Sequence, residues 1–176
     1  MQYCWWCGNS ATTREHKYKK SQLKRCFNSK EDLVRFSGKT TQPIRGLDSK
    51  RLKFNASLCR ICNNERSQPY DKAYDNFMLY IDKNSVEIIA EEQVDLENVY
   101  PGQGKQQFAL LLGYLVKHIS CRLAECNYSI PPNFIDFLNG KDPLRNLIFK
   151  FGINCGVVDA QERLRSDNID DGMFFL

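Results

Sequence analysis

Two Cys-x-x-Cys pairs constrain this chain more than any other feature of its sequence. Cys4 and Cys7 form the first pair, Cys59 and Cys62 form the second, and 51 residues separate Cys7 from Cys59. A turn that holds one pair points both sulfur atoms at one ion, and two such turns complete the tetrahedron that zinc prefers. The alternatives are four reduced cysteines in a core, or a redox pair. We predict a structural Zn²⁺ site, which leaves no open position for water, so any chemistry must lie beside it.

Composition and charge divide the 176 residues into two parts. Residues 1–80 have few long apolar runs, and a small domain of this kind usually needs a metal ion to hold it together. Residues 1–75 contain 16 Lys and Arg against 7 Asp and Glu, whereas residues 76–176 contain 9 against 14. We therefore expect a zinc-stabilised domain over residues 1–80 and a mainly helical accessory domain over residues 81–176. The basic part could bind a polyanion such as nucleic acid, or it could be a solvated face without a partner.

Local patterns predict helices more clearly than strands. Apolar spacing, acidic first turns and the positions of Gly and Pro predict five helices, at residues 31–36, 63–80, 105–127, 133–138 and 144–151. Residues 51–59 are expected to form a short strand that leads into a turn, and residues 85–96 fit a strand or a helix. No stretch reaches the roughly 20 apolar residues that span a bilayer, and the first ten residues lack the pattern of a signal peptide. We therefore expect a cytoplasmic protein with reduced cysteines.

Only one of the two histidines lies among residues suited to catalysis. His118 falls on the expected long helix and is interpreted as a packed residue. His16 follows Glu15 in a basic segment, where a neutral imidazole could take a proton from water and the carboxylate could hold a hard divalent cation. Along a regular strand these two side chains would point to opposite faces, so both serve one site only where the strand ends or bulges. Asp71 and Asp75 lie about one helix turn apart. They could cap or buttress the metal site or face solvent, and the second alternative is favoured.

The order of these motifs resembles the HNH family of nucleases. In TTREHKYKKS, the pair Glu15-His16 resembles the Asp-His that ends the first strand of the family's ββα-metal motif, and in LCRICNNERSQPYD the run after Cys62 resembles the start of its helix. The resemblance implies an α+β fold, with a small zinc-stabilised, HNH-like ββα-metal domain followed by the mainly helical domain. It implies that His16 is the general base. It also implies that Glu15 and Asn63, with Asn64 as a substitute, bind a catalytic Mg²⁺ or Mn²⁺.

The resemblance covers residues 1–80, and the sequence departs from the family's pattern in places. The family's central Asn, which orients the loop that holds the base, stands five residues before the third cysteine. That position is Phe54 here, and Asn55 is the nearest candidate for the supporting role. Nearby basic side chains are expected to contact phosphates and to position the nucleic acid without reading its bases. These are Lys17, Lys19, Lys20, Lys24, Arg25 and Arg66, with Arg51, Lys53 and Arg60 beside them. Trp5, Trp6 and Tyr18 could stack on bases or form a small core beside the zinc site.

The resulting functional prediction is a metal-dependent endonuclease that hydrolyses phosphodiester bonds in double-stranded DNA, which is favoured over RNA. The alternative is a zinc-stabilised module without catalysis that binds nucleic acid or a protein. The acidic helical part could form a homodimer or bind a protein partner.

Overall fold

The computed structural model describes residues 2–26, 33–37, 40–144, 148–149 and 151–152, and the side chains of residues 26–41 are not among the described features. Its elements in chain order are α1 (Lys20–Cys26), β1 (Leu33–Ser37), β2 (Thr40–Ile44), η1 (Lys50–Leu52), η2 (Ile61–Arg66), α2 (Gln68–Lys83), α3 (Ser85–Glu91), α4 (Leu96–Val99), α5 (Gly104–Glu125) and α6 (Pro132–Leu138). The structure is mixed and mostly helical, and it shows no clear ββα-metal fold. None of the described helices is long and apolar enough to span a membrane.

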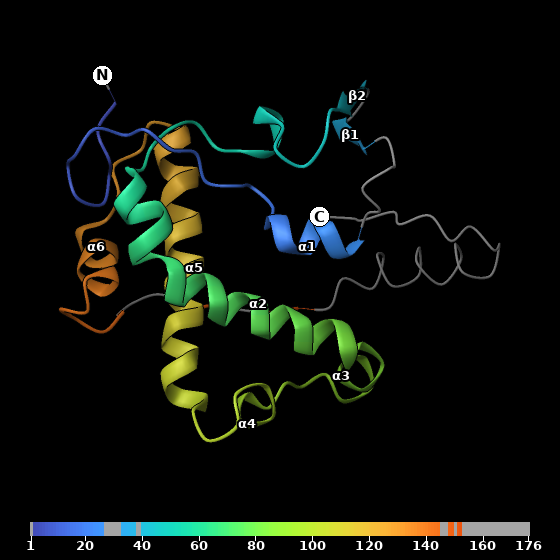
Figure 1. Ribbon diagram of the computed structural model, residues 1–176. Helices are drawn as coiled ribbons and strands as arrows, with labels where there is room; N and C mark the ends of the chain where they lie inside the picture. The colour runs from blue at the N-terminus through green and yellow to red at the C-terminus, as the bar shows by residue number, and fades with distance from the viewer. Residues whose placement is uncertain (1, 27–32, 38–39, 145–147, 150, 153–176) are drawn as a thin grey trace.

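The two longest helices, α2 and α5, form the centre of the molecule (Figure 1), and they confirm the helices expected at residues 63–80 and 105–127. The helices cross closely because Gly113 of α5 has no side chain, and a Cβ there would lie 2.6 Å from a ring carbon of Tyr70. The Tyr70 hydroxyl in turn donates a hydrogen bond of 2.9 Å to the Leu138 carbonyl at the end of α6. Helix α6 confirms the helix expected at residues 133–138, and this hydrogen bond anchors its end to α2.

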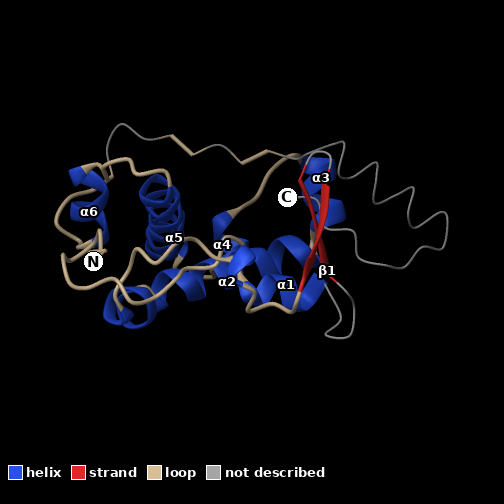
Figure 2. Cartoon of the chain, turned by 90° about the horizontal axis from the view of Figure 1, so that it is seen from above, coloured by secondary structure: helices blue, strands red, loops and turns tan. Residues whose placement is uncertain are grey.

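Among the shorter elements, the helix expected at residues 31–36 was wrong, and one short helix was not expected. Residues 33–36 belong to strand β1, which pairs antiparallel with β2, so that cross-strand pairing outweighs the weak helix signal. Figure 2 shows this hairpin at the opposite end of the molecule from α6, with α1 and α2 between them. Helix α1 was not expected at all, and its Leu23 packs in a small cluster with Ile44 and Leu52. Residues 85–91 form helix α3, which resolves the ambiguity there. Half of the residues of the expected helix at 144–151 lie outside the described residues, and the described half, residues 144, 148, 149 and 151, is not helical.

The segment expected as a strand at residues 51–59 pairs with the segment that carries Glu15 and His16, but only in an irregular way. Isolated antiparallel bridges join Thr13 to Leu58 and His16 to Lys53. The Phe54 amide donates to the Glu15 carbonyl at 2.8 Å between them. These two paired segments precede η2 and α2, but neither forms a regular strand. The two strands of the expected ββα-metal motif are therefore missing as regular elements.

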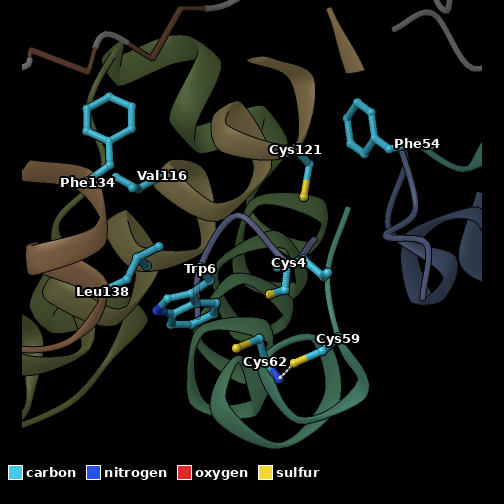
Figure 3. Close-up of a cluster of buried hydrophobic side chains, with 10 residues drawn as sticks. Cys4, Trp6, Phe54, Cys59, Cys62, Val116, Cys121, Phe134 and Leu138 are labelled. Atoms are coloured by element: carbon cyan, nitrogen blue, oxygen red, sulfur yellow. Dashed lines mark hydrogen bonds between the residues drawn. The ribbon is translucent and has the colours of Figure 1, made fainter. Parts of the chain in front are cut away.

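The main core joins both parts of the chain. Its buried members include Cys4, Trp6, Phe54, Leu58, Cys59 and Cys62 from the first part and Val116, Cys121, Phe134 and Leu138 from the second (Figure 3). A second cluster around Ala73, Phe77, Tyr100 and Leu111 holds α2, α4 and α5 together. The helical part therefore covers the two cysteine pairs, and burial of that apolar surface stabilises their placement.

Candidate functional site

The four cysteines of the two Cys-x-x-Cys pairs come together as predicted. The sulfur atoms of Cys4, Cys7, Cys59 and Cys62 all lie within 4.8 Å of one another. Figure 3 shows those of Cys4, Cys59 and Cys62 turned toward a common region beside Trp6. The first pair sits in a tight turn in which the Gly8 amide donates to the Cys4 carbonyl at 2.8 Å. Gly8 has a φ of 80°, a conformation that suits glycine.

The spacing of the sulfur atoms suits a tetrahedral metal site. Zn–S bonds of about 2.3 Å put the sulfur atoms of a tetrahedron roughly 3.8 Å apart, and the Cys7 and Cys59 sulfurs are 3.6 Å apart. Burial opposes ionisation of Cys59, but hydrogen bonds from the Cys62 amide and the Cys7 thiol lower its pKa to about 7. Among the described residues, these four cysteines are the cluster of potential metal ligands that lie close enough together to hold one ion. A zinc ion fits a cluster of four sulfur atoms.

Arg66 lies against the cysteine cluster. Its guanidinium donates to the Cys62 sulfur at 3.6 Å, stacks over the Trp6 ring at 4.5 Å from the centroid, and also bonds to the Asn139 side chain. Burial raises the pKa of Cys62, and the guanidinium opposes that rise, because a positive charge stabilises a nearby anion. The structure thus places Arg66 against the candidate metal site, and phosphate contact by Arg66 stays a prediction.

Glu15 lies in a buried ion-pair cluster that the sequence analysis did not foresee. Its carboxylate is 3.2 Å from the Nζ atom of Lys117 on α5, and that Nζ also lies 3.1 Å from Asp71 on α2. Lys19 pairs with the same Asp71 oxygen at 2.7 Å. Asp71 is therefore half-buried and paired, so the expectation that it faces solvent was wrong.

The pKa values in this cluster follow from burial and from the neighbouring charges. Burial raises the pKa of Glu15, and Lys117 opposes that rise. Burial also favours protonation of Asp71, but the ammonium groups of Lys117 and Lys19 outweigh it and lower the pKa of Asp71. For Lys117, burial favours the neutral form, yet Glu15 and Asp71 outweigh it and raise the pKa of the ammonium group. Lys117 is therefore charged at neutral pH.

His16 points to a different group of residues from Glu15. Its Nε2 atom is 3.8 Å from the Asp48 carboxylate, and Asp48 is also paired with Lys20 of α1 and, at 3.3 Å, with Lys53. Burial, and next the charge of Lys53, lower the pKa of His16, while Asp48 opposes them. The imidazole is therefore neutral at pH 7, and its buried Nε2 has no hydrogen-bond partner among the described residues.

None of the three asparagines of the HNH resemblance has a described side-chain contact with Glu15 or His16. Asn63 is half-buried, and its side-chain oxygen has no hydrogen-bond partner among the described residues, whereas Asn64 and Asn55 are exposed. Phe54 is fully buried in the core. The described contacts join Glu15 to Lys117 and His16 to Asp48, and none of them joins either residue to Asn63.

No family model, curated protein or solved structure matches this chain.

Most of the basic side chains expected to contact phosphates already have acidic partners. Lys17 pairs with Glu125 at 2.8 Å and Arg25 pairs with Asp82 at 3.0 Å, whereas Lys24 is exposed at the end of α1.

Lys17 also lines a cavity of about 310 Å³ together with Tyr18, Phe54, His118, Ile119, Arg122 and Leu123. Burial, and next the charge of Lys117, lower the pKa of His118 to about 4. His118 is thus a packed, neutral residue, as the sequence analysis expected.

Asp48 and Lys117, which define the surroundings of His16 and Glu15, were not predicted from the sequence. For Lys117 a signal was present. Gly113, Lys117 and Cys121 are spaced by four residues on the buried face of α5, so a charged residue falls where an apolar one is expected. Asp48 lies 32 residues from His16 in an irregular loop, and no pattern in the sequence joins the two.

Proposed function

We propose that this protein is an endonuclease that hydrolyses phosphodiester bonds in nucleic acid, with His16 as the general base. The observation that carries the proposal is the neutral imidazole of His16, with an unpartnered Nε2, beside two lysines that converge on one carboxylate. The structural resemblance is limited to the order of the parts: a cysteine pair, Glu15-His16, a return segment, a second cysteine pair and a helix.

The surroundings of Asp48 support phosphate binding. His16, Lys20 and Lys53 come from three different segments, and all three approach the exposed Asp48 carboxylate. A phosphate group carries the same sign of charge and offers similar oxygen acceptors, so it could take the place of this carboxylate. The two ammonium groups would then stabilise the negative charge that develops on the phosphate during hydrolysis. His16 Nε2 would take a proton from the attacking water as its oxygen bonds to phosphorus, the bond from phosphorus to the leaving sugar oxygen would break, and that oxygen would take a proton from Lys53 or from solvent.

The catalytic Mg²⁺ or Mn²⁺ of the sequence prediction does not fit the residues as the structure arranges them. Glu15 was its predicted first ligand, and the Glu15 carboxylate is paired with the ammonium group of Lys117. The proposed reaction therefore uses His16, Lys20 and Lys53 and includes no step through a divalent cation. The preference for DNA over RNA stays a prediction, as does a homodimer or protein partner through the acidic helical part.

A cleavage assay with matched variants tests the proposal. Supercoiled plasmid and single-stranded RNA are incubated with the wild type, with and without added Mg²⁺ or Mn²⁺, and alongside His16→Ala, Lys53→Ala and Lys72→Ala. His16→Ala should lose activity by about 10²-fold or more, the usual contribution of a general base. Lys53→Ala should lower kcat, because it removes a charge that stabilises the reacting phosphate, and Lys72→Ala, on an exposed position of α2, should match the wild type. Absence of wild-type cleavage under all conditions, or equal cleavage by His16→Ala, contradicts the proposal.

A second candidate function is a zinc-stabilised module that binds nucleic acid without cleaving it. It is favoured by the pairing of Glu15 with Lys117, which removes the predicted metal ligand. Under this alternative, the wild type should bind DNA with an affinity that falls steeply with salt, because phosphate contacts release counterions, and the DNA should stay intact.

A further inference from the structure

The ammonium group of Lys117 occupies the centre of a carboxylate cluster deep in the protein. Lys117 has 0% of its surface exposed, and Glu15 has 9%. The Nζ atom lies 3.2 Å from Glu15 and 3.1 Å from Asp71, and it also faces the Tyr114 ring, 5.5 Å from its centroid. A buried ammonium group is costly unless it is paired at such distances, so the two carboxylates are what holds Lys117 in place.

We propose that Lys117 is the resident cation of the Glu15–Asp71 pair, so that this protein carries a tethered ammonium group where its sequence suggests a divalent metal ion. The proposal extends the proposed function, because it makes hydrolysis independent of a metal ion at Glu15. Its own evidence and its own test concern cation binding.

Charge balance supports the proposal. Glu15 and Asp71 contribute two negative charges, and Lys117 and Lys19 contribute two positive charges in direct contact with them. Asp75 adds a third carboxylate at the edge, 3.9 Å from Lys19, and it accepts a hydrogen bond from Ser21. A divalent cation placed beside Glu15 would therefore meet two ammonium groups, and their repulsion opposes its binding.

The neighbouring packing keeps the ammonium group in position. Tyr114, three residues before Lys117 on α5, stacks on Tyr74 of α2 with ring centroids 3.9 Å apart. The Glu15 carbonyl accepts a hydrogen bond from the Phe54 amide, which fixes the backbone of the other partner. Lys117 is thus fully buried between fixed neighbours on both sides of the pair.

Manganese binding tests the proposal directly. The zinc-loaded wild type, Glu15→Gln, Lys117→Gln and the double variant are titrated with Mn²⁺, and bound ion is measured by electron paramagnetic resonance. Wild type and Glu15→Gln should bind Mn²⁺ equally weakly. Lys117→Gln should gain a site with at least about tenfold higher affinity, because two carboxylates then lack one ammonium group. The double variant should lose this gain.

Two outcomes of the titration overturn the proposal. One is a wild-type Mn²⁺ site that Glu15→Gln abolishes, and the other is a folded Lys117→Gln that gains no site. Because Lys117→Gln could fail to fold, the wild type is also labelled by reductive methylation, read by mass spectrometry. Lys117 should react at least about tenfold more slowly than the exposed Lys72, and equal rates contradict the burial on which the proposal depends. Absence of nucleic-acid cleavage contradicts only the proposed function, since no measurement here depends on cleavage.

Discussion

Replacing Lys117 with Met should destabilise the protein strongly, because it removes one partner of a buried ion pair. Met keeps the length of the side chain and removes its charge. Asp71 retains Lys19 at 2.7 Å, but Glu15 loses the partner that lies 3.2 Å away. Leaving a buried charge without its partner costs about 3–5 kcal/mol. For a chain of 176 residues, each kcal/mol shifts Tm by about 2–4 °C, so Tm should fall by roughly 6–20 °C.

The pH dependence of Lys117→Met follows from the pKa of Glu15. Burial already raises this pKa, and the variant removes the lowering influence of Lys117, so the pKa rises further. A folded-state pKa above the unfolded value favours the protonated folded form, and this stability is lost as pH rises through the folded-state pKa. The destabilisation should therefore be largest near pH 8 and should shrink as pH falls toward about 4.3, the usual value for Glu. Glu15→Gln in the same background should recover at least about half of the lost stability and remove this pH dependence.

Urea unfolding followed by tryptophan fluorescence measures these effects, since Trp6 is buried beside the cysteine cluster. Lys72→Met, the same change at an exposed position, is the matched control and should stay within about 0.5 kcal/mol of the wild type. A loss below about 1 kcal/mol in Lys117→Met, or no recovery from Glu15→Gln, would refute the assignment of a buried Glu15–Lys117 pair.

Three further predictions concern the metal centre, the helix crossing and His16. Cys59→Ser, or removal of metal by a chelator, should abolish cooperative unfolding, because zinc binding and folding are coupled. Metal analysis should find one zinc ion per wild-type chain. A metal-free wild type that unfolds cooperatively contradicts the zinc assignment. Gly113→Ala should lower the free energy of unfolding in urea by about 1–3 kcal/mol, since its Cβ would lie 2.6 Å from the Tyr70 ring. A more stable variant, as expected for Ala on an open helix surface, would show that the ring is not in contact with this position. Asp48→Asn should lower the pKa of His16 further, because Asp48 favours the charged imidazole, and NMR titration of the ring would show a rise or no change if the two groups are apart.

Much of the helical structure and the cysteine cluster could be predicted from the sequence, because both depend on short-range patterns. The helices at 63–80 and 105–127 follow from apolar spacing, and the four cysteines follow from their paired spacing. Strand β1 could not be predicted in the same way, because its formation depends on β2, a partner that the local sequence does not identify.

The surroundings of the candidate catalytic residues depend on contacts between distant parts of the chain. Along a regular strand, Glu15 and His16 would share one site only where the strand ends or bulges. In the structure, Glu15 contacts Lys117 and His16 contacts Asp48, so the two side chains serve different groups of residues. Lys117 is 102 positions from Glu15 in the sequence, and nothing in the local pattern around either residue points to the other.

The opposite charges of the two parts of the chain acquire a structural explanation from the same contacts. Ion pairs join the basic first part to the acidic second part, as in Lys17 with Glu125 and Arg25 with Asp82. Ion pairs at or near the surface contribute little stability each, so these pairs do not hold the parts together by themselves. Helix α5 does more, because Val116 and Cys121 pack in the cysteine-containing core while Lys117, between them in sequence, neutralises Glu15. A single helix thus covers the predicted metal centre and supplies the charge on which the arrangement of Glu15 depends.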